Sequence, residues 1–293
     1  MKYPKVSILI INYNGGDKVI RCLNSVMKLD YPSYEIIVID NGSSDGSQEK
    51  IKKEFSQIKL VENKENLGSV GAHNQGFKLA KGDFILGLDD DAVASPSLLK
   101  NLVKVALSNN KIGIVVPKIY YYSKPNIFNS TGFFLNPITG KMKDLGIGKE
   151  DKGQLDFQRE IDYVPSSIIL IKKEALKTAG GMNEDYFVYY EDSDWCLRVR
   201  NAGYKIVYTP NTKAWHDCKT QGELSPFRVY HYTRGKTLFM KQSSTPLNKF
   251  LFILFHIFLY SPARIFSFIL KGKFNLIKPY IQGTKEGLSS KRK

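Results

Sequence analysis

Residues 84–91 read FILGLDDD, an apolar run that ends on three consecutive carboxylates, Asp89, Asp90 and Asp91. A short apolar run of this kind is typical of a buried strand, and open α/β folds bind their ligands at the carboxyl ends of such strands. Three adjacent carboxylates repel one another, and a hard divalent cation relieves that repulsion while it bridges to substrate phosphates. The stretch therefore predicts a metal site at a sheet edge. An acidic turn that caps the helix beginning near Pro96 is the alternative.

Strand-like and helix-like segments alternate around this stretch. We expect buried strands at 6–11, 35–40, 58–62, 84–89 and 112–119, with helices at 18–29, 45–55, 69–81 and 96–109. This alternation predicts an α/β fold whose central sheet is mostly parallel and flanked by helices. Further along we expect a loop or small β excursion over 120–160, a strand at 161–172, helices at 173–178 and 191–202, and a short strand at 205–208.

The C-terminal segment differs from the rest in composition. Residues 241–293 hold ten of the 43 basic residues and a single acid, Glu286, although the whole chain has a net charge of +15. Within this segment residues 250–260 read FLFILFHIFLY, and Ser261-Pro262 interrupts the apolar run. We interpret the segment as a helix or helical hairpin in a membrane interface, with a single span or packing on the catalytic domain as alternatives. The predicted domains are 1–240, catalytic, and 241–293, membrane-associating.

The charge distribution and the cysteine content limit the cellular locations and the binding partners that we expect for this protein. Basic residues beside an apolar segment favour an anionic cytoplasmic leaflet, whereas no nucleic-acid recognition module is visible. The three cysteines, an odd number, suit a reducing compartment, and residues 1–5 enter a strand without an apolar leader. We expect a cytoplasmic protein, peripheral at the inner face of the membrane, with a single span left open.

Three short segments are candidates for binding a nucleotide. Tyr13 follows the first strand and offers a ring for stacking on a base. Asp40 ends the second strand, where its carboxylate accepts from a base N–H or a ribose hydroxyl. The segment from Asn66 through Gly68 to Asn74 leads into a helix whose N-terminus favours an anion. Ordinary turn and cap chemistry is the alternative for each segment.

Two further sites supply groups for catalysis. Glu191 and Asp192 open a helix after an aromatic segment, so partial burial is expected to raise the pKa of a carboxyl toward the range of a general base. Dipole complementation at the helix start is the alternative. His216 follows Trp215 in a predicted loop, where a neutral imidazole can complete a metal site with the aspartate cluster.

In combination these segments resemble the family 2 glycosyltransferases, most closely the rhamnosyltransferase-like subgroup. The likeness covers about residues 4–240 and rests on VSILIINYN, EIIVIDNGSSDGS, NLGSVGAHNQG, FILGLDDD and GGMNEDYFVYYEDSDW with the later histidine. It implies a GT-A fold and a metal-dependent (Mg²⁺ or Mn²⁺) hexosyltransferase that inverts the anomeric carbon of a nucleotide-diphosphate sugar.

The resemblance also assigns roles to residues. It implies that Asp40 reads the nucleobase beside Tyr13, that Asp91 and His216 hold the metal, and that Asp192 is the general base with Glu191 orienting it. Asp89 matches a ribose or metal contact. Because many subgroup members read Asn-Pro-Asp or Asn-Asp-Asp here, the triplet leaves open which acids bind the metal, and Asp90 stays a candidate donor contact.

The substrate classes follow from the resemblance together with the tail. A UDP- or dTDP-sugar, dTDP-rhamnose included, is the expected donor, and a saccharide or polyprenyl-linked saccharide of a cell-surface polymer the expected acceptor. A nucleotidyltransferase also uses clustered aspartates and Mg²⁺, but it has no need of Asp192, and its usual basic glycine-rich loop is absent after the first strand. A non-catalytic sugar-nucleotide or membrane-binding module is the other alternative.

Overall fold

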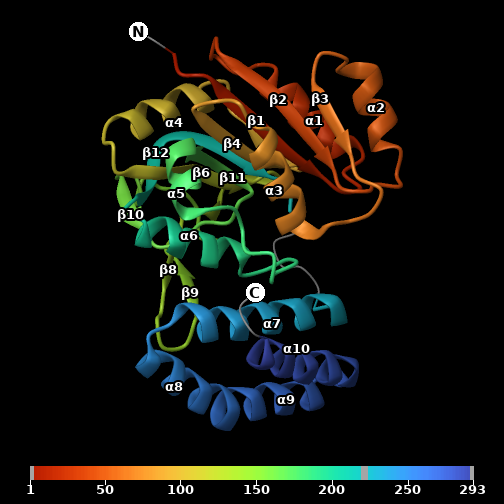
Figure 1. The fold of residues 1–293 in the computed structure, drawn as a ribbon, viewed down its shortest axis with the longest axis vertical. Coiled ribbons are helices and arrows are strands. Elements are labelled where there is room, and N and C mark those ends of the chain that lie inside the picture. Colours follow the sequence, from red (N-terminus) through yellow and green to blue (C-terminus); the bar gives the residue numbers. More distant parts are fainter. Residues whose placement is uncertain (1–2, 219–223, 291–293) are drawn as a thin grey trace.

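The computed structural model describes residues 3–218 and 224–290, and it contains a ten-stranded mixed sheet flanked by helices (Figure 1). Eight strands follow one another across the sheet in the order β10-β12-β6-β11-β4-β1-β2-β3, while β5 pairs with β12 and β7 with β6. The strands are β1 Val6–Asn12, β2 Tyr34–Asp40, β3 Lys59–Glu62, β4 Phe84–Asp89, β5 Ala92–Ala94, β6 Ile112–Tyr121, β7 Lys124–Ser130, β10 Arg159–Ile161, β11 Ile168–Lys172 and β12 Lys205–His216.

The N-terminal half of the sheet, β4-β1-β2-β3, is parallel as predicted. In register, Asn12 lies beside Asp40 and Ile11 beside Asp89, so three strands end at one edge. The other half is mixed, because β11 runs antiparallel to both β4 and β6. The predicted, mostly parallel sheet therefore describes the first half only.

Helices cover both faces of the sheet, since the strands are apolar on both sides. One core lies under α1 (Asp17–Val26), α2 (Ser47–Glu54) and α4 (Leu98–Leu107). The other lies under α3 (Gly68–Leu79), α5 (Lys173–Ala179) and α6 (Glu191–Asn201). These helices confirm the predicted segments, and each begins within two residues of its expected start.

Strand β12 is longer than predicted. It continues from Lys205 past Pro210 to His216, pairing in parallel with β6 and antiparallel with β5. Proline cannot donate to a ladder, and the pairing with β6 shifts register between Tyr208 and Lys213, which carries the strand past it. The predicted loop position of His216 is therefore wrong, because His216 is the last residue of this strand, opposite Ala92 of β5.

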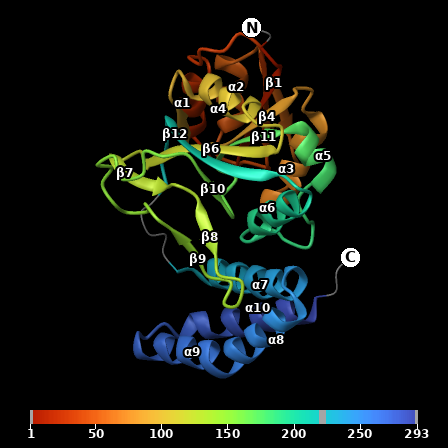
Figure 2. The ribbon, with the colours of Figure 1, turned by 90° about the vertical axis from the view of Figure 1, so that its left-hand side faces the viewer.

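Residues 120–160 form the expected β excursion. Besides β7, they include a hairpin of β8 (Phe133–Leu135) and β9 (Met142–Asp144) that reaches from the sheet toward α7 (Figure 2). The predicted strand at 161–172 is divided into β10 and β11. The connection between them, 162–167, passes the sheet edge at which β4 ends, and Asp89 N–H donates to Ser167 O there (3.0 Å).

The C-terminal helices form a separate layer beyond the sheet (Figures 1 and 2). They are α7 Pro226–Ser243, α8 Pro246–Phe255, α9 Ser261–Leu270 and α10 Ile277–Ser289. A π-helical turn, His256–Tyr260, joins α8 to α9 without a break, so Ser261-Pro262 does not create a hairpin; Pro262 lies in the first turn of α9, where its missing N–H is tolerated. The predicted domain boundary at 240/241 falls inside α7. Lys291, Arg292 and Lys293 of the predicted basic tail lie outside the described residues.

Candidate active site

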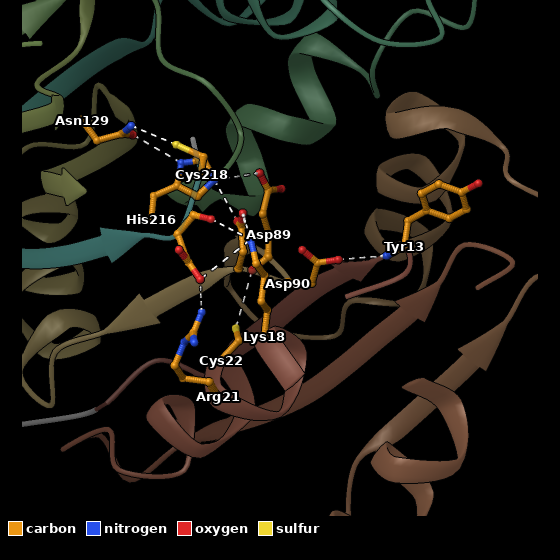
Figure 3. A network of polar contacts seen from close by, with 11 residues as sticks. Tyr13, Lys18, Arg21, Cys22, Asp89, Asp90, Asn129, His216 and Cys218 are labelled. Atoms are coloured by element: carbon orange, nitrogen blue, oxygen red, sulfur yellow. Dashed lines mark hydrogen bonds and ion pairs between the residues drawn. The ribbon is translucent and has the colours of Figure 1, made fainter. Parts of the chain in front are cut away.

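Asp89, Asp91 and His216 come together at the carboxyl edge of the sheet. Each offers one ligand atom, and these atoms lie within 4.8 Å of one another. His216 Nε2 is 2.8 Å from Asp91 Oδ1 and 3.9 Å from Asp89 Oδ2. Strand pairing explains the meeting: β4 ends at Asp89, β5 turns back along β12, and Asp217 N–H donates to Asp91 O (2.9 Å). Figure 3 shows Asp89 and His216 pointing toward each other.

The chemistry of this group fits a divalent metal ion. Within the described part of the chain, Asp91 Oδ1 is buried, and its close polar neighbour is His216 Nε2, 2.8 Å away, which carries a positive charge only when the imidazole is protonated. A buried carboxylate oxygen beside a neutral imidazole would lack a counter-charge, which is costly. Carboxylate oxygens with one imidazole nitrogen suit Mg²⁺ or Mn²⁺, and an ion between them would satisfy Asp91.

The charged side chains of the metal group lie close together and shift one another's pKa. Burial raises the pKa of Asp89 to about 7, with Asp90 and Asp91 adding repulsion; its side chain keeps 37% of its exposed surface, so solvent moderates this shift. Burial would also raise the pKa of Asp91, but His216 and Lys18 hold it below its usual range. Burial opposes protonation of His216, yet the aspartates raise its pKa to about 11. The two aspartates thus favour the protonated imidazole, and a bound cation would compete with that proton.

Asp90 points the other way from its two neighbours. Its Oδ2 accepts the backbone N–H of Tyr13 (3.0 Å), at the end of β1. Tyr13 is 48% exposed, so its ring is open for stacking (Figure 3). The three side chains therefore point in two directions: Asp89 and Asp91 face His216, and Asp90 faces the turn after β1.

Asp40 lies at the end of β2 and is completely buried. Its oxygens accept hydrogen bonds from Asn12 Nδ2 (2.6 Å), Gln48 Nε2 (2.8 Å) and both the N–H and hydroxyl of Ser43. Asn12 Oδ1 is buried and has no donor among the described residues. Asn12 and Asp40 are thus both enclosed, and Ser43, which the Asp40 carboxylate holds in place, is the partly exposed member of this group.

The loop before α3 carries the next predicted residues. Asn66 Oδ1 accepts from Gly68 N–H (2.8 Å) and Asn41 Nδ2 (2.9 Å), which ties the loop to the end of β2. Gly68 has φ +73°, and a Cβ there would lie 2.6 Å from Phe187, so only glycine fits. The structure does not bring the Asn74 side chain into this loop, because its amide makes two hydrogen bonds to the Met182 backbone.

Glu191 and Asp192 begin α6 after two strained residues. Tyr189 and Tyr190 both have positive φ, +67° and +70°, which is uncommon outside glycine and often marks functional sites. Glu191 is 3% exposed, and burial raises its pKa to about 7. Burial and the charge of Glu191 raise the pKa of Asp192 well above its usual range; Asp192 nevertheless keeps some exposed surface.

The acidic pair belongs to the same electrostatic unit as the metal group. The charge of Asp192 contributes to the raised pKa of Asp89. Within the described residues, Glu191 Oε2 and Asp192 Oδ1 are buried and lack a donor. These unpaired oxygens are suited to accept a proton or hydrogen bond from a bound hydroxyl group.

Sequence reasoning missed the cations beside the metal group. Lys18 Nζ is 3.7 Å from Asp91 Oδ2 and donates to Asp217 O (2.7 Å), while Arg21 forms an ion pair with Asp217 (Figure 3). Two features of the sequence could have indicated this contact: Lys18 and Arg21 are three residues apart on one helix face, and Asp217 directly follows His216. Only the pairing of β12 with β5 places them together.

The chain was compared with known proteins. The family model described as glycosyl transferase family 2 matches residues 7–180. Poly-beta-1,6-N-acetyl-D-glucosamine synthase of Staphylococcus epidermidis is 30% identical over 216 residues, which is 72% of this chain and 49% of that protein. The chain thus spans about half the length of the curated relatives it matches.

Solved structures show the same fold at low identity. GalNAc-T7 with UDP, GalNAc and Mn²⁺ superposes with a TM-score of 0.70 at 18% identity, covering 94% of this chain and 55% of that one. S. aureus TarS 1-349 in complex with UDP-GlcNAc gives a TM-score of 0.61 at 18% identity, covering 95% and 79%. The GT-A fold is thereby confirmed, while the rhamnosyltransferase-like subgroup stays a prediction.

Proposed function

The chain belongs to glycosyl transferase family 2 and is a glycosyltransferase, and from this premise we propose that it transfers a sugar from a nucleotide-diphosphate donor to a hydroxyl group with inversion. One observation carries the proposal: the acidic pair Glu191–Asp192, buried with unpaired oxygens, is electrostatically coupled to a three-residue metal group. A transferase of this kind needs both a base for the acceptor and a cation for the leaving diphosphate.

The metal group would hold Mg²⁺ or Mn²⁺ through Asp89, Asp91 and His216. When bound, the ion neutralises charge that develops on the departing diphosphate. Lys18, 3.7 Å from Asp91, adds a fixed positive charge on the same side. Asp90 holds the Tyr13 backbone and so shapes the turn against which the nucleotide binds.

Asp192 is the proposed general base. It keeps exposed surface while Glu191 is enclosed, so Asp192 is the carboxylate that a hydroxyl can reach. Its raised pKa makes it a stronger base than a solvated carboxylate, and base assistance of this type contributes about 10²–10⁴-fold. As the acceptor oxygen attacks, its proton passes to Asp192, and Glu191 orients the pair from behind.

The nucleotide is proposed to bind across the ends of β1 and β2. Tyr13 stacks on the base, and the partly exposed Ser43 meets its edge in front of the buried pair Asn12 and Asp40. The Asn66–Gly68 loop, held by its own hydrogen bonds to the end of β2, forms a wall beside the nucleotide. UDP appears with GalNAc-T7 and UDP-GlcNAc with TarS, which supports a UDP-sugar; a dTDP-sugar, dTDP-rhamnose included, is the other donor to test. Asn74 has a positioning role, holding α3 against the Met182 segment.

The acceptor is proposed to be lipid-linked, because the C-terminal layer has an apolar outer face. Pro246–Leu270 is a continuous helical stretch long and apolar enough to cross a membrane, and it is mostly exposed. Because α9 packs beside α7 and α10 through a small core, an interfacial position is favoured over a span. Its exposed apolar residues are Leu247, Phe250, Leu251, Leu254, Ile257, Phe258, Leu259, Phe266, Ile269 and Leu270.

The function is tested by nucleotide release from UDP-, dTDP- and GDP-sugars, with Mn²⁺ or Mg²⁺ and then with EDTA, in wild type and Asp192→Asn. We expect metal-dependent release of the nucleoside diphosphate from one donor class, with kcat reduced about 10²–10⁴-fold in Asp192→Asn. Release of pyrophosphate from a nucleoside triphosphate and sugar phosphate would favour a nucleotidyltransferase instead. Metal-dependent binding without turnover, even with membrane extract as acceptor, would favour a binding module.

A further inference from the structure

We propose that a basic cavity between α7 and the α8–α9 helix binds the phosphate or diphosphate group of a membrane lipid. The cavity has a volume of about 330 Å³, and Arg228 and Lys236 of α7, His256 of the π-helical turn and Arg264 of α9 line it. The helices that line it form a layer apart from the sheet (Figures 1 and 2). The inference extends the proposed lipid-linked acceptor and rests on that part of the proposed function.

The cavity concentrates positive charge that no acid of the described residues balances. Among the described residues, no carboxylate lies within ion-pair distance of Arg228, Lys236 or Arg264, although Arg234 of the same helix pairs with Glu286 (4.0 Å). Lys236 is 4% exposed, and its Nζ lies 4.4 Å from the centre of the Tyr260 ring. Burial lowers the pKa of Lys236 to about 8. A buried ammonium ion without a counter-charge is unfavourable, and an anion in the cavity removes that cost.

His256 is a second, independent sign of a ligand. It is 1% exposed and lines the cavity, and neither ring nitrogen has a hydrogen-bond partner among the described residues. Its ring stacks between Phe252 and Tyr260, at 5.0 and 5.5 Å, which fixes its orientation. It also begins the π-helical turn, and such turns are frequent at functional sites. A phosphate oxygen supplies the partner that the imidazole lacks.

The chemistry of the walls selects a phosphorylated lipid. Guanidinium and ammonium groups form strong, charge-assisted hydrogen bonds with phosphate oxygens. Val229 and Phe268 also line the cavity, so it is amphipathic. Beside it, the outer face of α9 exposes Phe266 (60%) and Leu270 (70%), a surface suited to hydrocarbon chains. A free phosphate would contact only the basic side chains, whereas a phosphorylated lipid would contact both the basic side chains and the apolar surface.

One contact between two tyrosine side chains connects the cavity with the segment that carries the acidic pair. Tyr232 lines the cavity, and its hydroxyl lies 3.4 Å from that of Tyr190, the residue directly before Glu191. Tyr190 also donates to Gly140 O (3.2 Å) at the tip of the β8–β9 hairpin. A lipid held by its phosphate group in the cavity would therefore lie one side-chain contact away from the segment that carries Glu191 and Asp192. Binding there positions the acceptor without contributing to the chemical step.

The experiment measures binding of the full chain to three kinds of vesicle: neutral phosphatidylcholine, phosphatidylcholine with phosphatidylglycerol, and phosphatidylcholine with a polyprenyl phosphate. We expect tighter binding to both phosphate-bearing anionic vesicles than to neutral ones. Arg228→Gln/Arg264→Gln should weaken that binding about tenfold to a hundredfold. Lys273→Gln/Lys278→Gln removes the same charge from exposed positions outside the cavity and should retain most of the affinity.

His256→Phe provides a variant that keeps the aromatic stack and the net charge. It should also weaken binding to the anionic vesicles, with an unchanged far-ultraviolet circular dichroism spectrum. A preference for polyprenyl phosphate over phosphatidylglycerol assigns the cavity to the acceptor lipid, and equal affinity assigns it to anionic headgroups in general; both support a lipid phosphate site.

Three outcomes would overturn the inference: equal binding to neutral and anionic vesicles, equal losses in the cavity and control pairs, or wild-type affinity in His256→Phe. Binding of inorganic pyrophosphate that is lost in Arg228→Gln/Arg264→Gln, together with unchanged vesicle binding in that variant, would reduce the site to a free phosphate site. Nucleotide release from the donor without vesicles is measured in the same variants. Its persistence separates failure of this inference from failure of the transferase proposal.

Discussion

The sheet edge and the basic cavity are two regions of opposite charge, each built without enough counter-ions among the described residues. At the edge, Asp89 and Asp91 face His216, and Glu191 and Asp192 lie near them. In the cavity, Arg228, Lys236 and Arg264 converge. Both arrangements cost folding free energy, which the packed cores around them offset. The comparison teaches that both regions leave charge unbalanced among the described residues, which is the reason for proposing a cation at one and a phosphate at the other.

The two regions differ in how their side chains are positioned. Strand register places the acidic group, since β5 and β12 align Ala92 with His216. Helix packing around a small core, Val229, Phe268, Leu276 and Tyr280, places the basic group. Strand pairing is enforced by a ladder of backbone hydrogen bonds, whereas helix packing depends on side-chain contacts. Substitutions in the acidic region should therefore change mainly the rate of catalysis. Substitutions in the basic region should change mainly the stability of the protein and its binding to membranes.

After the loss expected for Asp192→Asn, the largest effect is expected at the metal group. Asp91→Asn removes the charge of the carboxylate that lies beside His216, and we expect kcat for donor turnover to fall about 10²–10³-fold at saturating metal, as when a preorganised charge is removed. Steady-state nucleotide release measures it. Asp17→Asn removes an exposed carboxylate at the start of α1 and should leave kcat unchanged. Near wild-type turnover that EDTA still abolishes would exclude Asp91 as a ligand.

A large effect on stability is expected at Lys236. Its folded pKa of about 8 lies below its ordinary value of 10.5, so between these pH values the unfolded chain binds more protons and stability rises with pH. Lys236→Met should remove this rise and increase the free energy of unfolding at pH 7 by about 1–3 kcal/mol. Urea unfolding between pH 7 and 10.5 measures both changes.

The control for Lys236 is Lys241 on the same helix. Lys241 Nζ donates to the carbonyl oxygens of Leu288 and Ser290, so Lys241→Met should lower stability instead. Destabilisation by Lys236→Met at pH 7 would show that Tyr260 compensates the buried charge and that the cavity needs no anion.

The acidic pair should show the opposite dependence on pH. Glu191 has a folded pKa of about 7 against an ordinary value of 4.5, so the folded chain binds more protons between them and stability falls as pH rises through this window. Glu191→Gln should flatten the fall, which amounts to at most about 3 kcal/mol. Thermal unfolding from pH 4.5 to 7.5 checks it, with the exposed Glu184→Gln as control. If stability falls with pH in Glu191→Gln as steeply as in the wild type, Glu191 is not the group that causes the fall.

The smallest effect concerns the apolar face of the C-terminal layer. Phe258 is 70% exposed in the π-helical turn, and Phe258→Ser should weaken partitioning into neutral vesicles about tenfold, because burial of one aromatic side chain contributes about 2 kcal/mol. Vesicle flotation measures it. Leu107→Ser alters an exposed apolar residue of α4 (55% exposed), outside the C-terminal layer, and should have no effect. Similar losses in both variants would indicate non-specific adsorption.

Much of the fold could be predicted because its signals are local. The β-branched run in β2 and the apolar spacing of α1 indicate a strand and a helix without reference to other segments. The extent of β12 could not be predicted, since Pro210 marks an end in isolation and only the register shift against β6 carries the strand past it. For a similar reason the sequence left a single helix and a helical hairpin both open for the C-terminal segment; the π-helical turn before Pro262 makes α8–α9 one continuous helix.

For the candidate site, residue types could be predicted but not their partners. The triplet indicated a metal site, and the structure adds that Asp90 turns to Tyr13 while its neighbours face His216. The role of Lys18 beside Asp91 depends on where α1 lies relative to the sheet edge. The basic cavity left no signal beyond a general excess of positive charge, because its lining residues are spread over 57 positions from Leu224 to Tyr280.

The sequence by itself determined the alternating strands and helices, the acidic end of β4, the acid pair that opens α6 and the apolar C-terminal segment, because hydrophobic period and residue type belong to neighbouring residues. Only the tertiary structure decided that His216 meets Asp91 across 125 positions and that three cations share one cavity. The physical reason is that strand register and helix packing are set by the fit of whole surfaces, and no local pattern specifies which surfaces will meet.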